Sequence, residues 1–425
     1  MKRIKLGEVL DVKRGASLAG EFYSERGEKI RLTLGNFKYP GGGFKQNTSK
    51  KDIYFNGPVK PEFILNKGDI ITPLTEQVAG LLGETARIPE GNLYIQSGDI
   101  GLVIPDERLL DKDFAYYLVS SPLVKKQLDA AAQQTKIRHT SPDAIKDCVS
   151  YIPELMEQKK IAKLLDAIND KVTNNNAIAV ELESMAKDLY DYWFVQFDFP
   201  DENGKPYKSS GGKMVWNDEL KREIPEGWEN GIVSDLGTVV TGGTPSTGCA
   251  EYFAKSKSGH AWATPKDLSN LNGRYFYHGE ADITDAGLKN SAGNIMPKGS
   301  VLFTTRAPIG YIAITANEAC TNQGFKSIVP AKKFGTEFVF QTLKMLTPQM
   351  QRVGVGSTFK EVSKDVFSHQ SIVIPSVNLL KKYAALTLDI AEKIRNTQEE
   401  NVELTSLRDF LLPMLMNGQV KVKGA

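Results

Sequence analysis

The stretch IPELMEQKKIAKLLDAINDKVTNNNAIAVELESMAKDLYDYWF (152–194) is matched by a second stretch, IPSVNLLKKYAALTLDIAEKIRNTQEENVELTSLRDFLLPMLM (374–416). Ile152-Pro153 aligns with Ile374-Pro375, and the alignment then continues without a gap. Apolar residues recur in both stretches at spacings of three, four and seven, which is typical of a long amphipathic or coiled-coil helix. The sequence therefore predicts two long helices that were copied from one ancestor.

The repetition extends upstream, with small gaps. Leu6-Gly7 resembles Leu236-Gly237, and each pair precedes a turn that contains glycine. LNKGD (65–69) resembles MPKGS (296–300), and a short strand-like run follows each of them. A repeat of this length indicates a tandem duplication of one globular lobe plus one helix. The predicted fold class is α/β (α+β), with two duplicated globular domains separated by two long antiparallel coiled-coil helices. The predicted boundaries are 1–153 for the first lobe, 154–196 for the central helix, 197–225 for a linker, 226–375 for the second lobe and 376–418 for the C-terminal helix.

Two details of this architecture stay open at the sequence level. Each long helix either packs on its own lobe or pairs with the other helix and holds the lobes apart. Within the lobes, apolar spacing predicts helices over 111–132 and 337–351. The segment 197–225 is rich in Pro, Gly and Ser, which favours a linker.

The composition places the chain among globular proteins. Its 425 residues suffice for two or three domains, and 41% are hydrophobic and 24% charged. No run of eighteen apolar residues occurs, so no transmembrane helix is expected, and the first fifteen residues lack the apolar core of a secretory signal. Three cysteines and four histidines are scattered singly, which fits a reducing cytoplasm and argues against a metal centre.

Sequence motifs for catalysis are absent. The glycine pairs at 211–212 and 242–243 lack the lysine and hydroxyl of a nucleotide-binding loop, and no Ser or Cys nucleophile motif occurs. Paired acids such as Asp111/Asp113 and Asp282/Asp285 are interpreted as solvated charges. No cofactor is expected, and a recognition or assembly protein is favoured over an enzyme.

Several motifs occur together at fitting distances: FVQFDFPDENGKPYKSSGG (194–212), IPEGWE (224–229), LGTVVTGGTPS (236–246), MPKGSVLFTTRAPIGYIAI (296–314), TNQGFKSIVP (321–330) and LTSLRDFLLPMLMNGQVKV (404–422). In these motifs the chain resembles the specificity subunits of type I restriction–modification systems over essentially its whole length. The first lobe departs from the common pattern, with TEQVAGLLGETARI (75–88) where the second has TTRAPIGYIAITAN.

This resemblance implies a non-catalytic subunit in which each lobe reads one half of a split double-stranded DNA target. It implies that the helix pair sets the spacer between the half-sites and docks two modification subunits, which methylate adenine with S-adenosylmethionine. It further implies that restriction subunits, which are ATP-dependent nuclease-translocases, join the complex. Lobes 1–150 and 226–375 are mildly basic, which weakly favours a polyanionic partner.

Base reading requires Arg, Lys, Asn, Gln, Ser or Thr side chains on positioned loops. For Asn322 and Gln323, hydrogen bonding to the backbone inside the fold remains the alternative. The candidate DNA-binding residues are Lys13, Arg14, Thr75, Gln77, Lys136, Arg138 and His139 in the first lobe and Arg306, Asn322, Gln323, Lys326, Thr358 and Lys360 in the second.

Large apolar residues at the ends of both helices suit docking of a second protein, although packing of the helix ends on the lobes explains much of their number. The alternative function is a duplicated coiled-coil scaffold that binds another protein without reading DNA; an enzyme with an unrecognised site is a third hypothesis. The candidate partner-binding residues are Tyr190, Trp193, Phe194, Phe410, Leu411 and Leu415.

Overall fold

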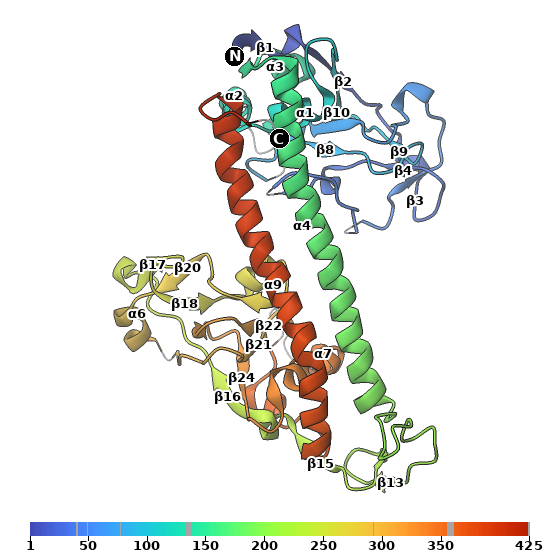
Figure 1. Cartoon of the computed structure of the whole chain (residues 1–425), viewed down its shortest axis with the longest axis vertical. Helices are drawn as coiled ribbons and strands as arrows, with labels where there is room; N and C mark the ends of the chain where they lie inside the picture. Colours follow the sequence, from blue (N-terminus) through green and yellow to red (C-terminus); the bar gives the residue numbers. More distant parts are fainter. Residues whose placement is uncertain are drawn as a thin grey trace. The chain divides into compact units, whose positions relative to one another are not determined.

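The computed structural model describes residues 1–39, 41–48, 50–76, 78–132, 138–291, 293–354 and 361–423. The chain divides into two compact units. The first unit comprises Met1–Val172 with Val402–Ala425, and the second comprises Thr173–Asn401. The division falls within the two long helices, α4 (Leu155–Tyr190) and α9 (Val377–Met416), so each unit contains one lobe and a part of each helix (Figure 1).

The first unit is built on an antiparallel sheet in the order β2-β10-β6-β8. A second sheet, β3-β5-β4-β9, contains one parallel pair, β4–β9. Two further pairs, β1–β12 and β7–β11, are antiparallel. The elements are β1 (Lys2–Lys5), β2 (Leu10–Arg14), β3 (Tyr23–Ser24), β4 (Ile30–Arg31), β5 (Tyr54–Phe55), β6 (Ile70–Pro73), β7 (Thr75–Glu76), β8 (Ala86–Arg87), β9 (Tyr94–Ile95), β10 (Ile100–Pro105), α1 (Lys112–Val119), α2 (Pro122–Ala131), β11 (Arg138–His139), α3 (Pro142–Asp147) and β12 (Val149–Ile152).

The second unit repeats this arrangement. The order β16-β24-β21-β22 corresponds to β2-β10-β6-β8 and carries one more strand, β19, at its edge. The pair β15–β25 corresponds to β1–β12, and the parallel pair β18–β23 corresponds to β4–β9. Its elements are β13 (Met214–Asn217), β14 (Arg222–Pro225), β15 (Glu229–Ile232), β16 (Gly237–Thr241), β17 (Phe253–Lys255), β18 (His260–Ala263), α5 (Pro265–Ser269), β19 (Tyr275–Phe276), β20 (Ala281–Ile283), α6 (Asp285–Asn290), β21 (Val301–Phe303), β22 (Ile312–Thr315), β23 (Ala319–Thr321), β24 (Lys326–Pro330), α7 (Gly335–Val353), α8 (Lys364–Ser368) and β25 (Ser371–Ile374).

Local chemistry at equivalent positions explains why the duplication preserved this fold. Ser141 caps α3 by accepting a hydrogen bond from the Ala144 N–H (3.0 Å), and Ser363 caps α8 in the same way (3.2 Å). A Cβ on Gly15 or on Gly242 would lie 2.4 Å or 2.2 Å from a backbone carbonyl oxygen. The glycines of both turns are therefore required by the close approach of a second backbone segment.

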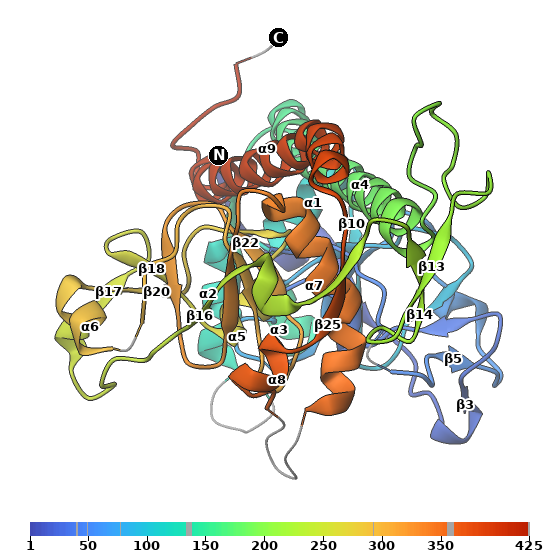
Figure 2. The same cartoon turned by 90° about the horizontal axis from the view of Figure 1, so that it is seen from below.

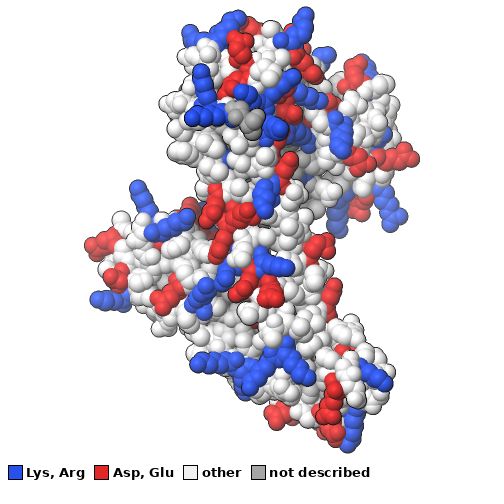
Figure 3. Space-filling view, viewed as in Figure 1, with Lys and Arg blue, Asp and Glu red and all other residues white. Residues whose placement is uncertain are grey.

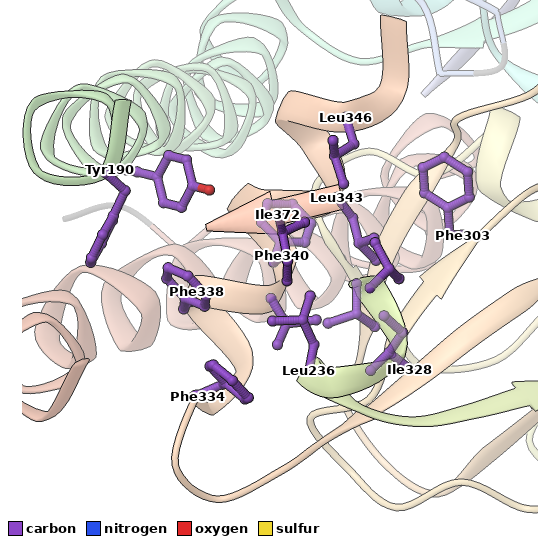
Figure 4. Close-up of a cluster of buried hydrophobic side chains, with 14 of the residues drawn as sticks. Tyr190, Leu236, Phe303, Ile328, Phe334, Phe338, Phe340, Leu343, Leu346 and Ile372 are labelled. Carbon is purple, nitrogen blue, oxygen red and sulfur yellow. The ribbon is translucent and has the colours of Figure 1, made fainter. Parts of the chain in front are cut away.

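The core of the second unit joins the lobe to the long helices. In Figure 4, Tyr190 of α4 lies beside the aromatic residues of α7, among them Phe338 and Phe340. Its hydroxyl lies 3.1 Å from Thr342 Oγ1. Figures 1 and 2 both show α7 beside the five-stranded sheet, which it contacts through β21, β22 and β24. In the first unit, Ile161 and Leu165 of α4 lie in the core of the lobe in a corresponding way.

Within each unit, α4 and α9 contact each other in antiparallel register. In the second unit the Asn175 side-chain amide donates to Glu400 (2.7 Å) and to Asn401 (3.0 Å). In the first unit Arg408 donates to the side chain of Asn169 (3.2 Å). The predicted fold class, mixed helix and sheet with two repeated lobes and antiparallel long helices, is confirmed. The apolar stripes of the helices are buried largely in the lobes, and Leu386, an expected member of the α9 stripe, is exposed.

Two expectations differ from the structure. The helix predicted over 111–132 is two helices, because Pro122 places the preceding Ser121 in an extended conformation that ends α1. The expected linker (197–225) contains the β13–β14 hairpin, and its aromatic rings are packed: Phe199 stacks on Tyr207 and on Trp228, with ring centroids 4.6 and 5.1 Å apart. A composition rich in Gly and Ser does not reveal the area that these few rings bury.

The buried thiols give a first prediction. Burial raises the pKa of Cys148 to about 11 and that of Cys320 to about 12. Both are buried, whereas Cys249 is partly exposed. Because the thiolate is the reactive form, iodoacetamide at pH 8 is expected to alkylate Cys249 alone in the folded chain, measured by intact mass. The control in guanidinium should show all three alkylated; labelling of Cys148 or Cys320 at the rate of Cys249 in the folded chain would contradict the burial.

Candidate functional site

In the first lobe, the pairing of β7 with β11 brings three of the predicted residues together. Arg138 lies opposite Glu76, and its Nε is 2.9 Å from that carboxylate. Glu76 is buried and also accepts two backbone N–H bonds, so its position is fixed. A second carboxylate, Asp129, lies 2.7 Å from the Arg138 guanidinium. The orientation of Arg138 is therefore set by two acids, the buried Glu76 and the exposed Asp129.

Thr75 has a different role from the one predicted for it. Its side chain is buried, and its hydroxyl donates to Asp99 (3.0 Å) and lies 3.2 Å from His139 Nδ1. Thr75 thus supports the exposed His139 instead of presenting its own hydroxyl to a ligand. Gln77 and Lys136 lie outside the described residues.

The second lobe carries an ion pair in the same region of the repeat. Arg306 and Glu361 form an isolated antiparallel β-bridge, and the Arg306 Nε lies 3.1 Å from the Glu361 carboxylate. Lys326 is buried and approaches the same carboxylate at 3.9 Å. Its burial lowers the pKa of this lysine. Here two cations share one acid, whereas in the first lobe two acids surround one cation.

The two ion pairs lie in the same region of the repeat but one position apart. The Val362 N–H donates to the Thr305 carbonyl as the Thr140 N–H donates to the Leu74 carbonyl, so Arg306 and Glu361 correspond to Thr75 and His139. Glu76 and Arg306 each follow a threonine shortly after the corresponding strands β6 and β21. Arg138 and Glu361 each precede the equivalent short helix, α3 or α8. The predicted Lys136, Thr358 and Lys360 belong to the segments 133–137 and 355–360, which lie outside the described residues.

A second group of predicted residues lies near the turns that contain Gly242 in the second lobe and Gly15 in the first. Asn322 accepts a hydrogen bond from the Gly324 N–H (2.9 Å), so the alternative interpretation of Asn322, bonding to the backbone within the fold, is the one that the structure shows. Gln323 is exposed and accepts a hydrogen bond from the Thr244 hydroxyl. In the first lobe, exposed Lys13 and Arg14 lie on β2, and within the described part of the chain neither forms an ion pair.

Charge is distributed evenly over the face shown in Figure 3, where basic and acidic side chains alternate. A broad field of one sign is absent from this face.

The residues predicted to bind a partner separate into two classes. Tyr190, Trp193 and Phe194 are buried in the core of the second unit, and Leu415 is buried in the core of the first. The prediction is wrong for these four residues. They stabilise the fold, because their side chains pack in the core of their own unit. Leu411 is partly buried against the first core, and Phe410 is 64% exposed.

Sites of other kinds are not found in the described part of the chain. No group of three His, Cys, Asp or Glu residues among the described residues is arranged to hold a metal ion. None of the described helices is long and apolar enough to cross a membrane.

The model of the type I restriction modification DNA specificity domain matches residues 1–184 and 225–406, one match for each half of the chain. The chain belongs to this family. The resemblance inferred from the motifs is thereby confirmed, and the chain is a specificity subunit of the type I restriction–modification class.

Individual relatives agree with this assignment. The MjaIX specificity subunit of Methanocaldococcus jannaschii is 35% identical over 195 residues, which cover 44% of this chain and 44% of the relative, less than half of its length. The HindI specificity subunit of Haemophilus influenzae is 24% identical over 381 residues, covering 77% of this chain and 81% of the relative. The crystal structure of the S subunit from M. genitalium has a similar fold, with a TM-score of 0.55 at 16% identity, covering 98% of this chain and 96% of that chain.

The ion pairs of the specificity subunit were missed by sequence reasoning. The partner of each charge lies more than fifty residues away, and only the three-dimensional pairing identifies it.

Proposed function

We propose that this specificity subunit is the non-catalytic DNA-reading part of a type I complex. Each lobe reads one half of a split double-stranded target, and the helix pair sets the spacer between the halves. The repetition of one fold in two units, with changed polar residues in each, supports this proposal best. Two modules that read the same face of a duplex must be separated by about one helical turn or a multiple of it, which suits a stiff connection.

The residues proposed to contact DNA are those that remain accessible. In the second lobe these are Arg306 and Gln323, with Lys326 contributing its charge from a more buried position. In the first lobe they are Lys13, Arg14, Arg138 and His139. Gln77, Lys136, Thr358 and Lys360 stay predictions from the sequence.

We further propose that the long helices dock two adenine methyltransferase subunits and that restriction subunits join this assembly. Large apolar side chains remain exposed on α4 and α9, which is unfavourable in a chain that works alone. Phe410 is among the most exposed of them, at 64%. In the second unit the exposed group is Ile178, Val180, Met185, Val377, Leu386 and Leu388, and in the first unit it is Met156, Val402, Leu407 and Phe410.

Replacing Arg306 by glutamine tests the DNA contact. If Arg306 contacts a phosphate, affinity of the assembled complex falls for all sequences and the slope of log K against log salt decreases by about 1. If it contacts a base, discrimination at that position falls by about 1–3 kcal/mol. The control is Glu361→Gln, which releases Arg306 and is expected to preserve or raise affinity. Unchanged affinity and unchanged specificity for Arg306→Gln would remove this residue from the interface.

Exchange of residues 226–375 for the second lobe of another specificity subunit tests the division of labour. The methylated motif is expected to change in one half-site and to keep the other, as mapped by sequencing of methylated adenine. The matched control is exchange of residues 1–153, which should change the opposite half. A methylated motif that stays the same after either exchange would mean that the lobes do not read the bases.

The alternative function, a protein-binding scaffold that does not read DNA, makes the opposite prediction for salt. Sequence-selective DNA binding through phosphates weakens steeply as salt is added. A complex whose only interactions are insensitive to salt would favour the scaffold.

A further inference from the structure

Each unit contains an arginine that joins its lobe to α4 through two carboxylates. In the first unit this is Arg87 on the edge strand β8. Its guanidinium binds Asp166 of α4 with two nitrogens, at 2.8 and 3.3 Å, and Asp113 of α1 at 3.1 Å. The guanidinium also lies over the ring of Tyr116, 4.3 Å from its centroid. Two charges and one aromatic face therefore fix the plane of this side chain.

The contact in the first unit continues from α4 to α9. The Tyr117 hydroxyl donates to Asp166 (2.6 Å) and accepts a hydrogen bond from the Asn169 amide (2.8 Å). Arg408 of α9 donates in turn to Asn169 (3.2 Å). One polar network thus links the lobe, α4 and α9.

In the second unit the arginine that joins the lobe to α4 is Arg274, which is 4% exposed. Its two terminal nitrogens each lie 3.0 Å from Glu337 of α7, and its Nε lies 3.3 Å from Glu183 of α4. Gln398 of α9 accepts from the Tyr275 N–H (3.0 Å) and donates to the Tyr275 carbonyl (2.6 Å). Both long helices therefore contact the lobe through polar groups here as well, α4 through the ion pair of Glu183 with Arg274 and α9 through the hydrogen bonds of Gln398.

The two arginines are not equivalent residues of the duplication. Arg87 lies on β8, which corresponds to β22, whereas Arg274 directly precedes β19, the additional edge strand. They nevertheless form the same arrangement, a guanidinium between an acid in the first turn of a lobe helix and an acid of α4. Copying of one ancestral lobe does not by itself account for this arrangement.

Apolar packing alone permits small rotations of one element on another. Where a planar guanidinium is bound by two carboxylates, the same rotation has to break an ion pair. We infer that Asp166 with Arg87 and Glu183 with Arg274 are positioning residues that hold the orientation of each lobe on α4 and thereby restrict the DNA spacer that the subunit accepts. This inference rests on the proposed function and adds residues that determine spacer specificity.

The test compares Asp166→Asn and Glu183→Gln with matched controls on the same helix. The controls are Asp170→Asn and Glu181→Gln, which make the same chemical changes at exposed positions. Each variant is assembled with the modification subunits and given DNA substrates whose spacer is varied one base pair at a time around the wild-type length. Adenine methylation is then measured for each spacer.

Loss of a charge-assisted contact predicts that discrimination against a spacer one base pair too long or too short falls by about tenfold for either variant. The half-site bases and the behaviour of both controls should stay as in the wild type. An unchanged ratio of methylation between the wild-type spacer and the altered spacers would show a merely structural role and overturn the inference, whether or not methylation falls overall. If neither carboxylate variant assembles, Arg87→Lys and Arg274→Lys decide, because they keep the charge and remove only the planar geometry.

Failure of the proposed function looks different. In that case the wild-type complex methylates no split motif, and the inference falls with it. A wild type that reads a split motif, with variants that keep the strict spacer, contradicts the inference alone.

Discussion

Replacing Arg274 by alanine is expected to lower the free energy of unfolding of the second unit by about 3–5 kcal/mol, because it removes the buried cation that binds Glu337 through two hydrogen bonds. Glu183 is partly exposed and keeps Lys344 at 3.6 Å. Trp193, Trp216, Trp228 and Trp262 are the only tryptophans of the chain and all lie in this unit. Tryptophan fluorescence during urea unfolding therefore reports this transition. The matched control is Arg87→Ala, which acts in the first unit and should leave the fluorescence transition in place.

The loss should also depend on pH. Burial already raises the pKa of Glu337, and removal of the neighbouring guanidinium raises it further. A carboxyl whose pKa is raised in the folded state contributes stability at low pH that is lost as the pH rises through that value. The destabilisation by Arg274→Ala is thus expected to be larger at pH 8 than at pH 5. Equal stability of variant and wild type at both pH values would contradict the buried ion pair.

Replacing Phe194 by alanine is expected to destabilise the second unit by about 3–5 kcal/mol, since it removes a buried ring from the core. The ring centroids of Phe338 and Tyr383 both lie 4.9 Å from that of Phe194. The measurement is again urea unfolding followed by tryptophan fluorescence.

The matched control is Phe410→Ala, the same change at an exposed helix position. Its effect on stability should stay within about 0.5 kcal/mol, while binding of the modification subunit weakens. If Phe194→Ala left stability unchanged and abolished subunit binding, Phe194 would belong to a docking surface and the burial described above would be wrong.

The sequence predicted the repeat, the long helices and the fold class because these depend on periodic patterns. It failed where one residue overrides a pattern: Pro122 divides a continuous apolar helix into α1 and α2. It also failed where a few aromatic rings pack together in a segment that is otherwise rich in small residues, as with Phe199 and Tyr207 in the expected linker.

The candidate site was harder to predict for a different reason. Residue type alone singles out Arg138 and Arg306 as candidates, but their fixed orientation depends on Glu76 and Glu361, which lie far away in the sequence. Thr75 and Trp193 have side chains that suit an interface, and only burial shows that the fold already uses them. Residue type thus indicates chemistry, whereas accessibility decides whether a partner can reach it.

The central claim is that this chain selects the DNA sequence that a modification subunit methylates. The most direct test is single-molecule sequencing of methylated adenine in cells that produce the chain with its modification subunit, compared with cells that lack only this chain. We predict a split motif with two defined halves and one spacer length, present only when the chain is present. Identical methylation in both cell lines, with assembly of the complex demonstrated, would contradict the claim and favour the scaffold.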